Sequence, residues 1–543
     1  MTRSTLPGLG RKAGHDPRTA ALSVLHAVLC AGEDSQAALD RHLVSPEMVP
    51  TDKRLCTELV YGALRAYGAL REDVDALLGN PDGLPLEMRL ALCLAWYELD
   101  RLRVPPHAAI HRTVRHIRNR FGPGLAGVAN GVLRSLLRRR SAGTDPCPQA
   151  DPSRSSAGDD ASLKQDTFAP SSALWAASPP APAGARKSRR RGGRPLTQPP
   201  EQCPSETALA RRHAMPPWIV RLWREQYGSE AALSFLAASS GRPPSGLRLN
   251  RRAPGWEEDR RALLEEAPPG LAPLRVGEAA LAFPGSLPWQ ARRLLAEGRA
   301  SRQSAASYQA LFALDPVSWP QPIWDACAGR GGKTLALLEA GIPVALASDP
   351  SSVRLRALCA EYIRLAPLLP LPALLSQSAT EEPFLPPSPA EGPGGEELFR
   401  RPASPDVRPA FFRTILVDAP CSGLGTLARR PEIRLRRTPA HLRDLAASQR
   451  AILDAVWDRL LPGGRLLYLT CTLNKAENED QIAAFLLRHP RAVRVGEFQT
   501  PPSSPLREFF YAAHLEKGLL REFILPAPGR GPAGCRENPE DTC

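Results

Sequence analysis

The stretch FFRTILVDAPCSGLGTL, residues 411–427, contains an apolar run that ends abruptly in an acid and a cysteine. Residues 414–417, Thr-Ile-Leu-Val, are mostly β-branched, which is typical of a strand that a parallel sheet buries on both faces. Asp418 and Cys421 follow within the turn-forming sequence DAPCSG. Because ligands bind beyond the carboxyl ends of strands in an open α/β sheet, this stretch predicts a parallel sheet and a functional site.

Two further strand ends have the same form. Residues 465–469 run into Thr470 and Cys471, and residues 322–324 run into the glycine-rich turn DACAGRGGKT. With residues 344–364 they make repeated strand–turn–helix units, which predict a doubly wound sheet. A single cysteine in a core strand is ordinarily inert, so the interpretation depends on finding two strand-end cysteines beside a turn of the form that holds a cofactor.

This combination of motifs resembles the RNA 5-methylcytosine methyltransferases that use S-adenosyl-L-methionine, and most closely the bacterial ribosomal RNA cytosine-C5 methyltransferases of the Sun/Fmu type. The matching segments are residues 325–334 (family pattern DxCAAPGGKT), Asp349 with residues 354–355, residues 418–425 (DAPCSGxG) with Arg429 and Pro431, and residues 470–471 with the ENE at 477–479. The resemblance implies methylation of carbon 5 of a cytosine in RNA, with small-subunit (16S) rRNA as the expected substrate.

The resemblance also implies the fold and its divisions. It predicts a multidomain chain with an all-α NusB-like bundle, a small α+β connector domain and an α/β Rossmann-like methyltransferase core. The expected boundaries are 1–141 for the NusB-like RNA-binding domain, 142–204 for a disordered linker, 205–299 for the connector, 300–525 for the core with an insertion at about 379–409, and 526–543 for a disordered tail. Helical spacing of apolar residues in the first segment, and a Pro- and Ser-rich composition in the second, agree with this division.

A cysteine is needed because carbon 5 of cytosine is a poor nucleophile until a thiolate adds to carbon 6. Cysteine suits that step, since it is partly ionised near neutral pH and adds reversibly to a soft carbon. The resemblance makes Cys471 the nucleophile and gives Cys421 the removal of the carbon-5 proton. Asp418 is expected at the pyrimidine edge and at the methionine end of the cofactor, with Lys333 supplying positive charge nearby, although a solvated lysine in a first helical turn is the simpler alternative.

Cofactor binding requires close approach of the backbone, which glycines allow, and an acid at the next strand end for the ribose hydroxyls. Asp349 supplies that acid, and Ser378 stands where the family has an acid that contacts adenine. The full set of expected cofactor residues is Cys327, Ala328, Gly329, Arg330, Gly331, Gly332, Lys333, Asp349, Ser378 and Asp418. A Walker A loop is rejected, because GxxxxGKT would need a glycine where Cys327 stands.

Bulk properties limit the partners and the compartment. The 543 residues exceed one core, and the formal charge of +14 indicates a polyanionic partner, although charge alone does not separate nucleic acid from a membrane surface. Eleven cysteines without a CxxC pair indicate a reducing compartment and no structural zinc. The longest apolar stretch, residues 365–375, is interrupted by three prolines and is too short to span a bilayer. A cytoplasmic monomer without a metal is expected.

Alternatives remain at this point. The arginines at residues 134–140 and the basic run at 186–194 fit RNA contact but also a solvated surface. A non-catalytic RNA-binding ribosome assembly factor could keep the same shell, and a tRNA cytosine-C5 methyltransferase would share the motifs. DNA cytosine methylation is weaker, because those enzymes use the cysteine of the Pro-Cys motif and lack the Thr-Cys partner.

Overall fold

A computed structural model describes residues 16–44, 48–142, 204–268, 270–366, 369–381 and 411–519. Almost all of the predicted linker at 142–204, including its basic run at 186–194, lies outside the described residues. The same is true of most of the predicted insertion at 379–409 and of the predicted tail at 526–543.

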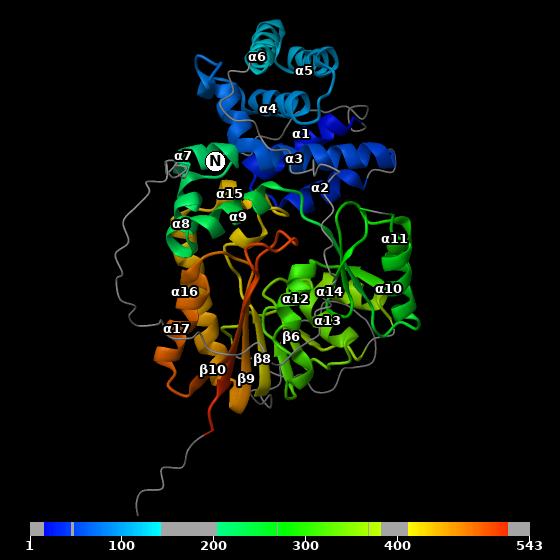
Figure 1. Cartoon of the computed structure of the whole chain (residues 1–543), viewed down its shortest axis with the longest axis vertical. Helices are drawn as coiled ribbons and strands as arrows, with labels where there is room; N and C mark the ends of the chain where they lie inside the picture. Colours follow the sequence, from blue (N-terminus) through cyan, green and yellow to red (C-terminus); the bar gives the residue numbers. More distant parts are fainter. Residues whose placement is uncertain are drawn as a thin grey trace, which may run out of the picture.

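The N-terminal part is a bundle of helices, drawn from blue to cyan at the top of Figure 1. Proline stands at the start of four of these helices, where its missing N–H removes no intrahelical bond. Helix α4, which does not begin with proline, is buried along most of its length and forms the centre of the apolar core. The helices are α1 (Pro17–Cys30), α2 (Ser35–Leu43), α3 (Pro50–Asp75), α4 (Leu86–Asp100), α5 (Pro106–Phe121) and α6 (Pro123–Ser141).

The middle part joins three helices to a small antiparallel sheet. The sheet has the strand order β2-β3-β1-β4, and its last strand, β4, pairs with β1, so that residues 300–302 complete it. Its strands are β1 (Ser245–Leu249), β2 (Leu274–Val276), β3 (Ala280–Phe283) and β4 (Ala300–Arg302). The helices that precede it are α7 (Glu206–Arg212), α8 (Pro217–Tyr227) and α9 (Ser229–Ser240), and those between its strands are α10 (Trp256–Glu265) and α11 (Trp289–Ala296).

The C-terminal part is a seven-stranded sheet with the order β10-β11-β9-β8-β5-β6-β7. The five strands from β9 to β7 are parallel, and β11 is antiparallel to both of its neighbours. The strands are β5 (Ile323–Asp325), β6 (Leu346–Ser348), β7 (Ala373–Leu375), β8 (Phe412–Asp418), β9 (Leu460–Thr470), β10 (Ala492–Gln499) and β11 (Tyr511–Lys517). The helices around it are α12 (Ala305–Phe312), α13 (Gly332–Glu339), α14 (Ser352–Arg364), α15 (Ile433–Arg436), α16 (Pro439–Asp458) and α17 (Glu479–Arg488). The predicted fold class is confirmed.

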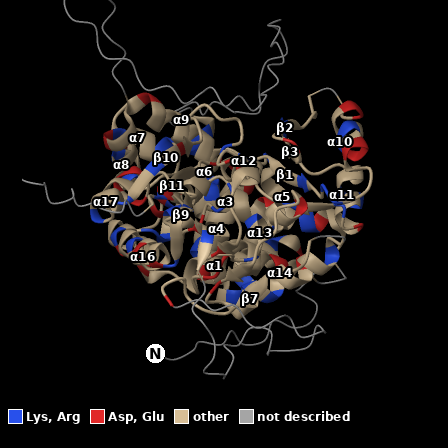
Figure 2. Cartoon of the chain, turned by 90° about the horizontal axis from the view of Figure 1, so that it is seen from below, with Lys and Arg blue, Asp and Glu red and all other residues tan. Residues whose placement is uncertain are grey.

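Alternation along β8 shows how the sheet is buried. Ile415 and Val417 pack into one apolar cluster with Tyr468, and Leu416 packs into another with Leu467. Residues of α16 and α17 belong to the first cluster and residues of α13 belong to the second, so helices cover both faces. Acidic and basic residues are interspersed along the chain, as the coloured ribbon of Figure 2 shows.

A short segment of the core, residues 432–436, contacts both of the other parts of the chain. Arg434 in α15 is 1% exposed, and its Nη atoms donate to the carbonyl oxygens of Arg65 in the N-terminal bundle and of His213 and Ser239 in the middle part. Burial, with the charge of Arg65 nearby, lowers the pKa of this guanidinium to about 9. The buried hydroxyl of Ser35 also donates to a carboxylate of the same segment, 3.0 Å from the Oε2 atom of Glu432.

The connector sheet is joined to the core by a buried ion pair. Arg248 in β1 donates from Nε and Nη2 to both carboxylate oxygens of Glu339 in α13, at 2.6 and 2.8 Å, and from Nη1 to the carbonyl oxygen of Gly332 at 2.8 Å. Both side chains of the ion pair are almost completely buried. The pair therefore supports the turn that begins α13.

Replacing Glu339 alone should be costly, because Glu339→Leu leaves the guanidinium of Arg248 buried without a carboxylate. The expected loss of stability is about 3–5 kcal/mol, seen as a lower urea midpoint of the core. The double variant Arg248→Met/Glu339→Leu should recover most of that loss. If the double variant is as unstable as the single one, the loss of stability does not come from the unpaired charge of Arg248.

Candidate active site

Two cysteines meet at the carboxyl edge of the sheet. Strands β8 and β9 are parallel neighbours in which Asp418 lies opposite Leu469, so the residues that follow each strand emerge side by side. The Sγ atoms of Cys421 and Cys471 lie 3.2 Å apart, and the backbone N–H of Cys471 donates to the sulfur of Cys421. The structure thus brings together the two cysteines that the motifs singled out.

A close approach of two backbones makes this meeting possible. The N–H of Gly425 donates to the carbonyl oxygen of Cys471 at 3.1 Å, and the N–H of Phe509 donates to the carbonyl oxygen of Gly425 at 2.8 Å. A Cβ at Gly425 would lie 2.1 Å from the oxygen of Phe509, which is well inside the contact distance of two atoms. Only glycine fits at this position, which explains the last glycine of the DAPCSGLG motif.

The two thiols are not electrostatically equivalent. The pKa of Cys471 is lowered, chiefly because the thiol of Cys421 donates a hydrogen bond to it and because Lys333 and Arg430 place positive charge nearby; burial and Asp418 act in the opposite direction. The pKa of Cys421 is raised well above its usual range by that same hydrogen bond and by burial. The pair therefore favours one negative charge, on Cys471, with the proton on Cys421.

A buried carboxylate holds the two strand-end loops in register. Glu477 is 0% exposed and accepts four hydrogen bonds, from the N–H and the hydroxyl of Ser422 at 2.8 and 2.6 Å and from the amides of Gln449 and Asn474 at 3.0 Å each. Ser422 belongs to the loop of Cys421, and Asn474 belongs to the loop of Cys471. Glu477 therefore fastens one loop to the other, and this explains the first acid of the ENE motif.

Asn478, the middle residue of that motif, holds the backbone around Cys471. Its side-chain oxygen accepts from the hydroxyl of Thr470 at 2.5 Å, and its amide donates to the carbonyl oxygen of Thr472 at 3.0 Å. The backbone on both sides of Cys471 is thus fixed by one buried side chain. Such fixed positions keep a reacting sulfur within the narrow range of geometries that chemistry needs.

Lys333 and Asp418 form an ion pair beside the cysteines. The Nζ atom of Lys333 lies 2.5 Å from Oδ2 of Asp418, and the lysine is only 7% exposed, so it is not a solvated residue of the first helical turn. The side chain of Asp418 remains 35% exposed. A carboxylate held from the protein side and open on the other is placed to meet a ligand.

The glycine-rich turn after β5 has the backbone form that the sequence predicts. Gly329 and Gly331 have positive φ angles of +56° and +83°, which favour glycine, and a Cβ at Gly331 would lie 2.4 Å from Cγ of Leu358. Asp349, after β6, accepts from the N–H of Gly329 at 3.1 Å and from that of Ser351 at 2.8 Å. The acid at the second strand end thus stands directly beside the turn.

The remaining residues of the turn have different surroundings. Ala328 is buried, and its N–H donates to the carbonyl oxygen of Ser348, whereas the side chain of Arg330 is exposed. Burial, with the charges of Asp325 and Asp418, raises the pKa of Cys327 well above its usual range. Cys327 also packs against the apolar cluster that contains Trp324 and Ala326.

Beyond β7, the structure draws attention to a residue that the motifs missed. Ser378 is half-buried, and its hydroxyl lies 2.8 Å from that of Thr380. Its neighbour Gln377 is 7% exposed, and its buried Nε2 atom has no hydrogen-bond partner among the described residues; the same is true of Oδ1 of Asp325. An unpartnered buried amide after one strand and an unpartnered carboxylate oxygen at the end of another suit a ligand with both acceptors and donors, as S-adenosyl-L-methionine has.

Two negative findings apply to the part of the chain that the structure describes. Within those ranges no group of three His, Cys, Asp or Glu side chains is arranged to hold a metal ion. None of the described helices is both long and apolar enough to cross a membrane.

Comparison with known proteins decides the family. Residues 397–505 match the model described as 16S rRNA methyltransferase RsmB/F, and residues 15–138 match the model of the NusB family. The ribosomal RNA small subunit methyltransferase B of Vibrio cholerae serotype O1 is 30% identical to the chain over 513 residues, which are 92% of the chain and 97% of that protein. The chain belongs to the RsmB/F family of 16S rRNA methyltransferases.

Other matches agree with RsmB/F membership. The ribosomal RNA small subunit methyltransferase B of Salmonella typhi is 29% identical over 478 residues, 86% of the chain and 91% of that protein. The crystal structure of PH0851, at 20% identity, covers 92% of this chain and 99% of its own with a TM-score of 0.62, and it shares the fold. The predicted resemblance and the predicted enzyme class are confirmed.

The thiol pair gives a test of its electrostatics. Cys421→Ala removes the hydrogen-bond donor that lowers the pKa of Cys471, so that pKa should rise and the thiolate fraction at neutral pH should fall. We expect the rate of Cys471 alkylation by iodoacetamide, followed by peptide mass spectrometry against pH, to have its midpoint at higher pH and to be several-fold slower at pH 7. Cys30→Ala, which removes an exposed thiol of α1, is the control and should leave the profile in place. An unmoved midpoint in Cys421→Ala would show that the two sulfurs are not coupled.

Proposed function

We propose that the chain transfers a methyl group from S-adenosyl-L-methionine to carbon 5 of a cytosine in small-subunit ribosomal RNA. The observation that supports this most directly is the thiol pair, in which the lowered pKa of Cys471 provides a thiolate and Cys421 stands 3.2 Å away. Membership of the RsmB/F family supplies the substrate class.

In the proposed reaction the thiolate of Cys471 bonds to carbon 6, and the electron pair displaced from the ring double bond makes carbon 5 nucleophilic. The ion pair of Asp418 with Lys333 provides hydrogen-bonding capacity and positive charge for the pyrimidine edge at N3, where negative charge develops. S-adenosyl-L-methionine supplies an electrophilic methyl group on a sulfonium. Carbon 5 then carries both the new methyl group and a proton that has to leave.

The same pair of thiols explains how Cys421 can take that proton. In the free enzyme Cys421 keeps its own proton, because its hydrogen bond to Cys471 raises its pKa. Once Cys471 is bonded to carbon 6 it carries no charge, and this cause of the raised pKa is gone. Cys421 can then lose its proton to solvent water, and the thiolate so formed accepts the proton on carbon 5. The electron pair of that C–H bond re-forms the ring double bond and expels Cys471 as a thiolate.

The cofactor is assigned to the turn at residues 327–333 and to Asp349 and Asp418. The glycine-rich turn is assigned to the methionine part, with open space beside Gly329, and the carboxylate of Asp349 is the partner for the ribose hydroxyls. Ser378 and Gln377 are assigned to the adenine end, where the buried amide of Gln377 lacks a partner among the described residues.

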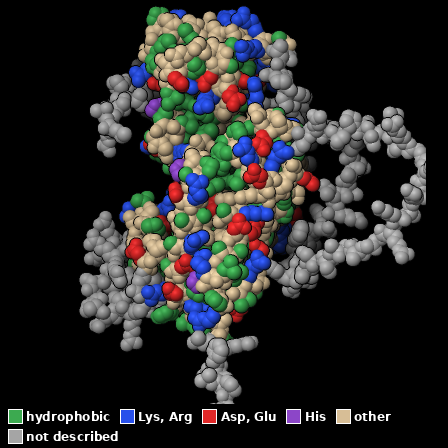
Figure 3. All heavy atoms as spheres, turned by 90° about the vertical axis from the view of Figure 1, so that its left-hand side faces the viewer, with side chains coloured by type: hydrophobic (Ala, Val, Ile, Leu, Met, Phe, Trp, Pro, Cys, Tyr) green, Lys and Arg blue, Asp and Glu red, His purple; other side chains and the backbone are tan. Residues whose placement is uncertain are grey.

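The N-terminal bundle, residues 1–141, is assigned to RNA contact. The predicted boundary between 299 and 300 is moved to 302, because β4 (Ala300–Arg302) pairs with β1 in the sheet of the middle part. Figure 3 shows basic side chains gathered at the top of the molecule, where this bundle lies. The exposed arginines of α5 and α6 are Arg115, Arg118, Arg120, Arg134, Arg138 and Arg139. Phosphate neutralisation by such residues gives affinity that depends on salt rather than on sequence.

A non-catalytic assembly factor is the rival function. It would have no need of a thiol pair in which one member is kept ionised and the other protonated, nor of a buried carboxylate that fastens the two loops. Action on transfer RNA would use the same chemistry, and comparison of candidate RNAs in the assays below distinguishes it. The site is proposed to work in the cytoplasm as a monomer.

The two cysteines should fail at different points of the reaction. Cys471→Ala cannot add to carbon 6, so it should give neither product nor a covalent complex. Cys421→Ala keeps the nucleophile but should stall after methyl transfer, leaving protein bonded to RNA. Denaturing gels with labelled small-subunit RNA and S-adenosyl-L-methionine should show a shifted band for Cys421→Ala only. A shifted band for Cys471→Ala instead would reverse the two roles.

The cofactor assignment is tested at the ribose. Asp349→Ala should weaken binding of S-adenosyl-L-methionine at least roughly tenfold in calorimetry, because ribose hydroxyls that are buried without a partner cost about 1–3 kcal/mol. Arg354→Ala is the matched control: its exposed guanidinium lies 3.5 Å from Asp349, so its removal should change affinity little. Equal affinity in wild type and Asp349→Ala would reject this placement.

A further inference from the structure

A cavity of about 370 Å³ lies where the N-terminal bundle meets the middle part of the chain. Its walls come from α3 and α4 on one side and from the end of α7 and from α9 on the other, and Figure 1 shows α7 beside the bundle. The polar lining consists of Arg65, Tyr97, Arg101, Arg212, His213 and Ser240. It is distinct from the site at the carboxyl edge of the sheet.

The lining of this junction cavity is cationic. Among the described residues, three arginines line it and no Asp or Glu does. The nearby Glu58 is engaged by the hydroxyl of Tyr97 at 2.9 Å and by Arg242 at 3.8 Å, while Asp100 pairs with Arg101 at 2.9 Å. Burial lowers the pKa of Arg65; Glu58 opposes that shift, and the charge of Arg242 adds to it. The arginines at and beside this cavity therefore outnumber the carboxylates that pair with them.

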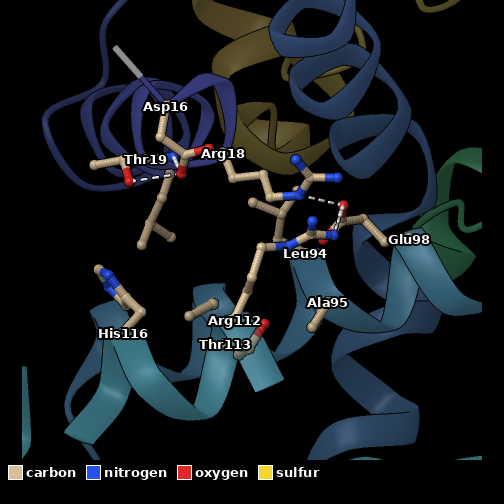
Figure 4. A pocket seen from close by; sticks show the side chains of 11 residues that line it. Asp16, Arg18, Thr19, Leu94, Ala95, Glu98, Arg112, Thr113 and His116 are labelled. Atoms are coloured by element: carbon tan, nitrogen blue, oxygen red, sulfur yellow. Dashed lines mark hydrogen bonds and ion pairs between the residues drawn. The ribbon is translucent and has the colours of Figure 1, made fainter. Parts of the chain in front are cut away.

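A second pocket, inside the bundle, shows the opposite arrangement. It encloses about 60 Å³, and its cations face carboxylates: Nε of Arg18 lies 2.5 Å from Glu98 and Nη2 of Arg112 lies 3.9 Å from it. Figure 4 shows both guanidinium groups directed toward Glu98, with Asp16 hydrogen-bonded to Thr19 nearby. In this smaller pocket, carboxylates balance the charges of the arginines. The junction cavity differs, because no Asp or Glu among the described residues lines it.

We propose that the junction cavity binds a backbone phosphate of the RNA substrate; this inference rests on the proposed function. A guanidinium presents paired donors that match phosphate oxygens, and three arginines line a space large enough for a phosphate with its sugar. The neutral imidazole of His213, whose pKa burial and the neighbouring Arg212 and Arg434 lower to about 4, adds a hydrogen-bonding group without a charge.

The position of the cavity gives the bound phosphate a second effect. The carbonyl oxygens of Arg65 and His213, two lining residues from different parts of the chain, both accept from Nη1 of Arg434 at 3.3 Å. Arg434 belongs to the segment that continues from Cys421 and Gly425. A phosphate in the cavity would therefore draw the bundle and the middle part together around the loop that carries one of the active-site cysteines.

The test compares RNA binding in two charge-matched double variants of the full chain. Arg101→Ala/Arg212→Ala removes two exposed guanidinium groups of the lining, and Arg356→Ala/Arg443→Ala removes two exposed ones from α14 and α16. With labelled small-subunit RNA, the first should weaken binding at least roughly tenfold and lower the slope of log affinity against log salt by about 0.7 for each phosphate that is no longer neutralised. The second should weaken binding about twofold or less.

The outcomes separate the site from the enzyme. Equal weakening in both double variants, or no weakening in either, would overturn the cavity as a phosphate site while leaving methyl transfer untouched. Failure of the wild type to bind or methylate any candidate RNA would instead overturn the proposed function. Arg101→Lys/Arg212→Lys keeps the charges but not the paired donors, so it should keep the salt slope of the wild type and recover only part of its affinity. Thermal melting of each variant confirms that it is folded.

Discussion

The buried carboxylate of Glu477 is the interaction on which the site depends. It accepts from Ser422 in one strand-end loop and from Asn474 in the other, so the separation of the two sulfurs is set by a group that touches neither of them. A charge at 0% exposure is stable only when its oxygens are fully hydrogen-bonded, and here four donors meet it. The rigidity that brings Cys421 and Cys471 to 3.2 Å is thus a consequence of satisfying one buried charge.

Much of this architecture could be predicted from the sequence, because its signals are local. The β-branched run before Asp418 predicts a strand buried on both faces, and alternate residues of β8 do pack into two different clusters. Glycines predict the turns, and Gly425 and Gly331 stand where a Cβ would clash. The motifs also named the cysteines, and the parallel register of β8 and β9 then brings them together.

What escaped prediction depends on interactions between residues far apart in the chain. Lys333 could be read as a solvated residue until its pairing with Asp418 was seen, and Gln377 belongs to no motif, since only its burial marks it. Arg434 has the same appearance in sequence as the arginines around it. Its burial follows from three carbonyl groups contributed by other parts of the chain, and no spacing within residues 429–437 indicates that.

The hydrogen bond from Phe509 to Gly425 also affects when the site can form during synthesis. Strand β11 is the last of the sheet to leave the ribosome, yet it lies between β10 and β9, and the turn before it supplies the N–H that fixes the loop after Cys421. Domains fold as units while the chain grows from its N-terminus. A nascent chain that has passed Cys471 already contains both thiols but lacks the strand and turn that hold the loop in place. We therefore expect the geometry of the thiol pair to be completed only after translation has passed β11.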